Sequence, residues 1–167
     1  RRNTGSFGTI NYMANQDGFT LYDTVAYNYR HNEANGEDNR DGSEFNYSWN
    51  CGIEGATRKQ AIRKMREQQM RNAFLMLLLS QGTPMIYGGD EFANSQAGNN
   101  NAWCQDNAVG WTDWKNAKKQ ENLSTFVKEA IAFRKKHPIL HMPQEMRGVD
   151  YMAKGFPDIS VHGERAW

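Results

Sequence analysis

The sequence INYMANQDGFTL, residues 10–21, decides the fold. Two alternating faces along its first part predict a strand over residues 9–17. The strand ends at a carboxylate, Asp17, and Gly18 then turns the chain. In α/β barrels the groups that carry the chemistry stand at the carboxyl ends of the strands. Asp17 is therefore the first candidate for a functional residue, although an Asp-Gly pair is also common in plain turns.

A long helix and a second strand follow. Residues 57–81 predict the helix, with Thr57 and Gln60 as a capping box. Its second half, residues 73–79, is apolar on all sides and should be buried. Residues 84–90 then predict a short buried strand that closes at Asp90 and Glu91.

Shorter helices and two polar loops complete the chain. We expect helices from Thr20 to about Tyr29 and over residues 122–137, with loops over residues 31–56 and 93–120. Strands that alternate with helices predict an α/β fold with parallel strands. Parallel sheets are normally buried on both faces, so two strands alone suggest the last quarter of a barrel.

Composition excludes some classes of function. The chain has 167 residues and a net charge of +1, so no bulk charge favours nucleic acid or a membrane surface. No apolar stretch is long enough to span a bilayer, and no signal peptide opens the chain. We therefore expect a cytoplasmic location.

No cofactor or metal is expected. The Asn- and Asp-rich loop does not have the spacing of an EF-hand, and the two cysteines form no zinc pattern. Cys51 and Cys104 are interpreted as buried reduced thiols, and a single disulfide between them stays open.

A series of short motifs identifies a family. Residues 9–140 resemble the glycogen-debranching and isoamylase-type glycosidases of the α-amylase family. Each motif is weak alone, but their order is specific. They are DGFTL (17–21), HNEANGE (31–37), WNCG (49–52), RN (71–72), LSQGTPM (79–85), GGDEF (88–92), GNNNAWCQDN (98–107) and WTDW (111–114).

The resemblance implies a C-terminal portion of a (β/α)8 TIM barrel that hydrolyses α-1,6 branch linkages in glycogen-like glucans. The two strands and two long helices would be its strands 7–8 and helices 7–8. Residues 1–141 would form a partial catalytic domain. Residues 142–167 would begin a linker toward a C-terminal β-domain that the chain does not reach.

The resemblance also implies a role for Asp17. A retaining glycosidase needs a nucleophile and a general acid, and this family places them on the fourth and fifth strands. Neither strand is present, so the chain alone should be inactive. Asp17 matches the family's third acid, which binds the sugar at the −1 subsite and helps to distort its ring. Gln16 stands where the family usually has His, so catalysis should be slower or altered in specificity.

A polar run offers further sugar contacts. Asn99, Asn100 and Asn101 carry amides suited to sugar hydroxyls, and Trp103 could stack on a glucose ring. The plainer interpretation is a loop that bonds to itself, with Trp103 in the core. Asp90 and Glu91 are interpreted as residues that shape the barrel mouth.

The expected partner is a branched α-glucan. Two other functions stay open. The chain could bind α-glucan without cleaving it, or it could self-associate through the unpaired strand edges of an incomplete barrel.

Overall fold

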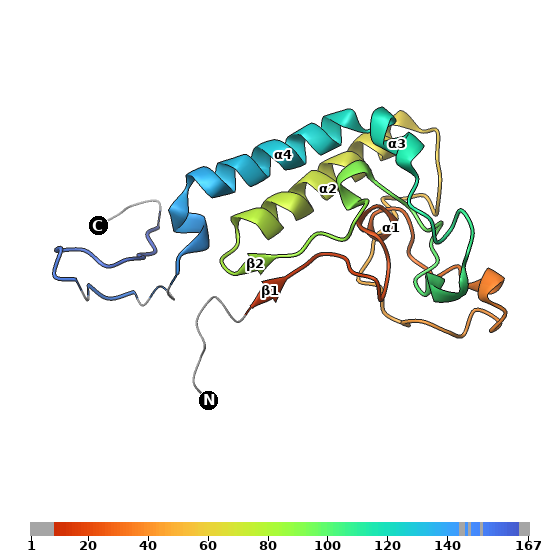
Figure 1. Ribbon diagram of the computed structural model, residues 1–167, viewed down its shortest axis with the longest axis horizontal. Coiled ribbons are helices and arrows are strands. Elements are labelled where there is room, and N and C mark those ends of the chain that lie inside the picture. Colours follow the sequence, from red (N-terminus) through yellow and green to blue (C-terminus); the bar gives the residue numbers. More distant parts are fainter. Residues whose placement is uncertain (1–8, 144–145, 147, 151, 164–167) are drawn as a thin grey trace.

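Two parallel strands and two long helices form the centre of the molecule (Figure 1). The computed structural model describes residues 9–143, 146, 148–150 and 152–163. Its strands and α-helices, in chain order, are β1 (Ile10–Asn11), α1 (Leu21–Thr24), α2 (Gln60–Leu79), β2 (Thr83–Pro84), α3 (Trp114–Lys119) and α4 (Glu121–Lys136). Short 3-10 turns occur at Glu33–Asn35, Asp90–Phe92, Ala102–Cys104 and Pro138–His141.

The strands are shorter than predicted. Ile10 pairs with Thr83 and Asn11 with Pro84 in parallel, and the Thr83 N–H donates to the carbonyl of Thr9 at 2.9 Å. The predicted ranges 9–17 and 84–90 were wrong in extent, although the parallel pairing was correct. The second strand gives way to the 3-10 turn at Asp90–Phe92.

Helix α2 differs from the prediction at its start. It begins at Gln60, with Lys59 as N-cap and no capping bond from a side chain. The Thr57 hydroxyl accepts from the Lys59 N–H at 3.2 Å, so it stabilises the turn before the helix. The predicted capping box is therefore not formed.

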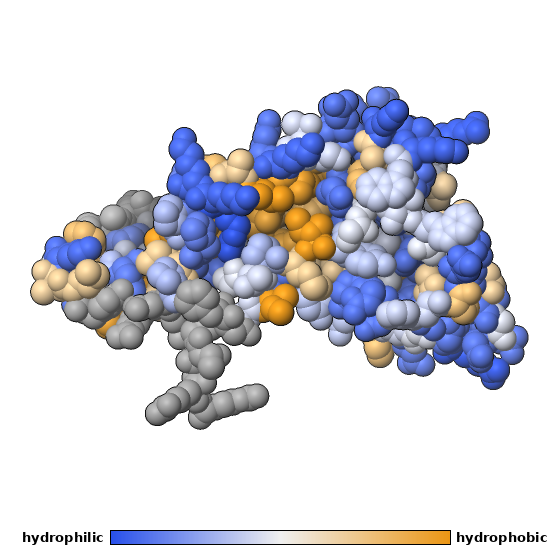
Figure 2. Space-filling model, viewed as in Figure 1, coloured by the Kyte–Doolittle hydropathy of each residue, from blue (hydrophilic) through white to orange (hydrophobic). Residues whose placement is uncertain are grey.

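The apolar half of α2 is buried on one face only. Phe74, Leu77 and Leu78 are buried, whereas Met76 is 65% exposed and Leu79 is 41% exposed. In Figure 2, hydrophobic side chains gather on the surface over the middle of α2 and α4. Burial on all sides was the wrong prediction for the described residues, because no element covers the outer face.

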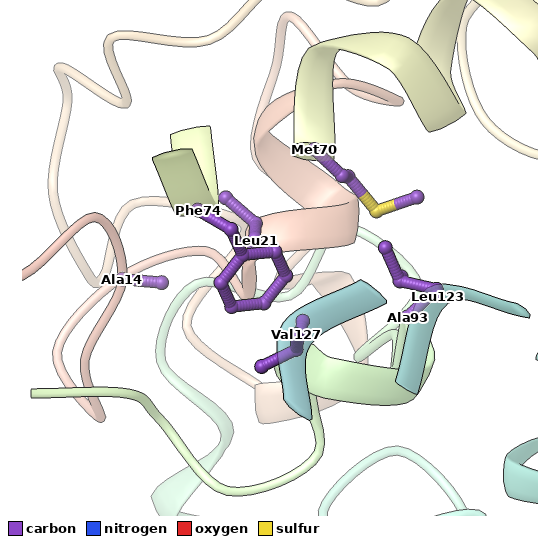
Figure 3. Close-up of a cluster of buried hydrophobic side chains, with 7 residues drawn as sticks. All are labelled: Ala14, Leu21, Met70, Phe74, Ala93, Leu123 and Val127. Atoms are coloured by element: carbon purple, nitrogen blue, oxygen red, sulfur yellow. The ribbon is translucent and has the colours of Figure 1, made fainter. Parts of the chain in front are cut away.

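The core lies where α1, α2 and α4 meet. Phe74 stands at its centre, with Leu21 of α1 and Val127 of α4 beside the ring (Figure 3). The cluster consists of Ala14, Leu21, Met70, Phe74, Ala93, Leu123 and Val127. This core fixes α1, and with it the segment that follows Asp17, against the two long helices.

Helix α4 is one residue offset from its predicted range and also supports the end of α2. The buried Arg134 side chain donates to the carbonyls of Leu78, Ser80 and Gly82, each at 2.7 Å. The last carbonyls of a helix have no partners within it, so a cation there satisfies them and meets the helix dipole favourably.

Two shorter helices also depart from expectation. Helix α1 ends at Thr24, well before Tyr29. Helix α3 lies inside the predicted loop 93–120, where the Asp113 side chain accepts from the N–H groups of Lys115 and Asn116. This N-cap explains why a helix begins within a polar stretch.

Beyond Met142 the described residues form no helix or strand. Among the described residues, none of the helices is long and apolar enough to cross a bilayer.

Candidate functional site

Asp17 lies on an exposed segment just beyond β1. Its N–H donates to the Asn15 side-chain oxygen at 2.8 Å, which orders the backbone before the turn. Gln16 beside it is also exposed. Both side chains are therefore accessible to solvent on the segment between β1 and α1.

The chain after Asp17 is anchored at once. Gly18 adopts a φ of 146°, a value that L side chains rarely take, and Phe19 then enters the interior. The Thr20 hydroxyl caps α1 by accepting from the Asp23 N–H at 3.2 Å. This sharp turn holds the Asp17 carboxylate at the surface while the following residues are buried.

Asp90 joins the 3-10 turn that follows β2 to the start of α1. Its carboxylate accepts from the Leu21 N–H at 2.9 Å, inside the protein. Burial raises the pKa of Asp90 to about 7, with further increases from the negative charges of Glu91 and Asp23, and the bond from Leu21 opposes this rise. Asp90 therefore holds the start of α1 against the segment that follows β2, and its part in shaping a barrel mouth stays a prediction.

Asp23 makes a second connection between the same loops. It accepts from the Ser95 hydroxyl at 2.6 Å and from the Gln96 N–H at 2.8 Å. Burial raises the pKa of Asp23 to about 6, while these hydrogen bonds lower it. No local sequence pattern predicted this role of Asp23, because its partners Ser95 and Gln96 lie more than 70 residues away.

The two Asn-rich loops bind each other. Asn32 and Asn100 exchange bonds, from the Asn32 amide to the Asn100 side-chain oxygen at 2.8 Å and from the Asn100 N–H back at 3.0 Å. The Asn100 amide also donates to the Ser43 carbonyl at 2.9 Å. We call residues 31–46 and 94–101, with these bonds, the loop network.

Close approach inside the loop network requires a glycine. Gly42 has a φ of 74°, and a Cβ there would lie 2.2 Å from the Asn100 side-chain oxygen. The Asp41 carboxylate beside it accepts from the Asn35 and Asn101 amides at 2.7 and 2.8 Å, and these bonds lower its pKa. Both amides donate to the same oxygen, Oδ2, whereas Oδ1 is buried without a hydrogen-bond partner among the described residues.

The predicted sugar-binding run divides into two parts. Asn99 and Asn100 are buried and bonded within the loop network, so their amides are already occupied. Asn101 is half-buried, and Trp103 is 71% exposed and not in the core. The Asn101 amide is also occupied, by the Asp41 carboxylate, so Trp103 is the most accessible residue of this run, and sugar contact stays a prediction.

No group of three or more His, Cys, Asp or Glu residues could hold a metal ion in the part of the chain that the structure describes. Cys51 and Cys104 are both free thiols. No disulfide joins them in the structure; Cys51 is buried as predicted, whereas Cys104 is exposed, so burial was the wrong prediction for Cys104.

Comparison with known proteins places these features in context. No protein-family model matches the chain. It is 48% identical over 140 residues to a glycogen operon protein GlgX homolog of Mycobacterium tuberculosis, covering 84% of this chain and 19% of the relative. A glycogen debranching enzyme of Enterobacter sp. is 46% identical over 140 residues, again 84% of this chain and 21% of the relative.

A plant protein and a solved structure are also similar to this chain. Isoamylase 1 of Oryza sativa subsp. japonica is 45% identical over 127 residues, 76% of this chain and 16% of the relative. The fold matches pullulanase from Anoxybacillus sp. LM18-11, solved with maltotriose, with a TM-score of 0.58 and 23% identity over 84% of this chain and 16% of that structure.

The chain therefore shares its fold with a segment of α-amylase-family pullulanases, in line with a fragment of a TIM barrel. It spans 19% of the length of the mycobacterial relatives that it matches. The resemblance is confirmed: over 84% of its length this chain is homologous to a segment of the glycogen-debranching and isoamylase-type enzymes.

Proposed function

We propose that this chain is part of the catalytic barrel of a retaining glycosidase that cleaves α-1,6 branch linkages in glycogen-like α-glucans. In this proposal β1 and β2 begin the seventh and eighth strands, and α2 and α4 are the corresponding helices. Residues 142–167 lead toward a C-terminal β-domain, and the protein is cytoplasmic. Support comes from relatives named glycogen debranching enzyme and isoamylase, and from the likeness to a pullulanase solved with maltotriose.

The observation that carries the proposal is the position of Asp17. This carboxylate is exposed on the segment that follows β1, between the buried residues Ala14 and Phe19. An ionised carboxylate can accept short, charge-assisted bonds from two neighbouring sugar hydroxyls. Such bonds speed the reaction to the extent that they strengthen in the transition state. The nucleophile and proton donor would come from other strands.

Gln16 should change how strongly the site stabilises the transition state. Its amide donates hydrogen bonds but neither titrates nor carries charge, unlike the His that the family usually has there. In the full-length enzyme, Gln16→His should therefore raise turnover on branched glucan. An unchanged kcat in Gln16→His would contradict the claim that Gln16 slows the reaction.

The central test uses the full-length enzyme that contains this chain. Asp17→Asn should lower kcat/KM for debranching about a hundredfold or more, since a transition-state contact is lost. Glu129→Gln, a matched change on the exposed side of α4, should leave the rate unaltered. Equal rates in wild type and Asp17→Asn would refute the proposed role.

A second arm uses the 167-residue chain by itself. It should release no reducing ends from branched glucan, because it carries only the third acid. Sustained release that disappears in Asp17→Asn would mean that the chain is sufficient by itself, and the assignment of Asp17 as the third acid would then be wrong.

Self-association is the second candidate function. The exposed apolar side chains of α2, with Met76 at 65% and Leu79 at 41% exposure, favour it. Light scattering over a range of concentrations tests it. A monomer at every concentration would reject it.

A further inference from the structure

A wide cleft lies apart from Asp17. Its volume is about 980 Å³, comparable with the larger ligand-binding pockets of proteins. One wall is the first half of α2, the other is the segment 111–116, and Tyr22, Met70 and Ala93 are among the residues beneath. Neither Gln16 nor Asp17 lines it.

Two exposed indole rings stand on one wall. Trp111 is 59% exposed and Trp114 is 72% exposed, which is unusual for such large apolar side chains. The Trp111 indole N–H donates to the Asp106 carboxylate at 3.0 Å. The Trp114 ring packs against Phe92 with centroids 5.6 Å apart. Each ring is therefore held in place and still has accessible surface.

The backbone under these rings is also fixed. The Asp113 N–H donates to the Asn94 side-chain oxygen at 2.9 Å, and the Asn116 amide donates to the Phe92 carbonyl at 2.9 Å. Asp113 caps α3 in addition. Binding to this wall would therefore cost little conformational entropy, because its groups are already ordered.

The facing wall supplies hydrogen-bond donors. Gln60, Arg63 and Lys64 of α2 are exposed and line the cleft. Arg66 lies deeper, and its buried Nε–H has no acceptor among the described residues. Donors opposite flat aromatic surface suit a sugar chain, whose ring faces pack on indole while its hydroxyls accept hydrogen bonds.

We propose that this cleft is a second α-glucan site, which holds a glucan segment on Trp111 and Trp114 away from the reacting linkage. The choice of glucan as ligand rests on the proposed function. The cations of α2 would also suit an anion, but an anion would not require the two aromatic rings. The site keeps the protein on a large branched substrate while Asp17 engages one branch point.

The test measures binding of maltoheptaose to the 167-residue chain by calorimetry. Trp111→Ala and Trp114→Ala should each weaken binding about tenfold, and the double variant more. Trp114→Phe should retain most of the affinity, because it keeps an aromatic face. Trp49→Ala, an equally large change at a half-exposed tryptophan outside the cleft, should bind as wild type does. Circular dichroism of each variant separates lost binding from lost folding.

Three results would overturn the proposal. One is no binding by a folded wild-type chain. Another is normal binding by the folded double variant, with loss in Asp17→Asn, which would place the sugar beside the catalytic carboxylate. The third is displacement of maltoheptaose by inorganic phosphate, which would indicate an anion site. None requires hydrolysis, so failure here is distinct from failure of the proposed function.

Discussion

The loop network differs from the strand side of the molecule, by which we mean β1, the residues just after it and the exposed face of α2. The two regions differ in how their side chains are paired or covered. In the loop network, buried amides such as Asn32 and Asn100 find their partners within the chain. On the strand side, Ile10 of β1 is 62% exposed, Tyr12 just after β1 is 53% exposed, and Met76 of α2 is 65% exposed. The buried amides of the loop network are hydrogen-bonded within the chain, whereas the strand side presents apolar side chains to solvent.

This difference teaches where the chain depends on other elements. Buried polar groups are mostly hydrogen-bonded in folded proteins, because an unpaired one costs free energy. Apolar surface has no such directional requirement and is buried only when something covers it. The strand side therefore matches the proposal that further strands and helices pack there, and the loop network does not need them.

The largest effect is expected within α2 itself. Phe74→Ala removes the centre of the core and should cost about 3–5 kcal/mol of unfolding free energy. Met76→Ala, half a turn away on the exposed face, should cost less than about 0.5 kcal/mol. Urea denaturation of both variants gives the comparison. Equal losses would show that the outer face is covered in solution, for example by a second copy.

The next largest loss of unfolding free energy is expected at Arg66, which holds the 50–55 segment. Its guanidinium donates to the carbonyls of Gly55 at 2.7 Å and Asn50 at 3.0 Å, and also to Ile53. Arg66→Met would leave these carbonyls without the donor and should cost about 3 kcal/mol. Arg63→Met, one turn earlier and exposed, is the matched control. A small loss in Arg66→Met would mean that the 50–55 segment is not held by this residue.

Asp90 should make stability depend on pH. The folded protein keeps its proton up to about pH 7, whereas the unfolded chain releases it near the ordinary pKa of 3.8. The folded state therefore binds more protons between these values, and stability falls as pH rises through this window. Asp90→Asn keeps an oxygen that can accept from the Leu21 N–H but has no proton to release. The fall in unfolding free energy between pH 4 and 8 should therefore be smaller in this variant, by roughly 2 kcal/mol. Denaturation midpoints from pH 4 to 8 would reveal it, and an unchanged slope would contradict it.

The smallest expected difference in stability is between alanine variants of Thr20 and Thr57. Thr20 is buried and caps α1, so Thr20→Ala should cost about 1 kcal/mol. Thr57 does not cap α2, so Thr57→Ala should cost less than about 0.5 kcal/mol. Thermal unfolding of the two variants measures this difference. A larger loss at Thr57 would restore the predicted capping box.

Sequence patterns located the helices better than the strands. The spacing of Leu123, Val127 and Ala130 correctly predicted α4, because helical burial is set by contacts along one face. Strand length depends on partners distant in sequence, so it was overestimated for β1 and β2. Helix α3 was missed because its start depends on the Asp113 cap within an otherwise polar stretch.

The candidate site was predictable in part for similar reasons. Asp17 follows from local sequence and the family motif, and its exposure agrees with a binding role. The connections through Asp23 and Asp90 join residues about 70 positions apart, so no local pattern contained them. The matching Asn content of the two loops was the available sign that they could bond to each other.

The bonds from Arg134 also bear on the order in which the chain folds during synthesis. Its acceptor at Gly82 lies 52 residues earlier, so the turn between α2 and β2 emerges from the ribosome long before its donor. Until then these carbonyls must be satisfied by water. Nascent chains that end before residue 134 would therefore lack these bonds, and the turn that leads from α2 into β2 would be held less firmly.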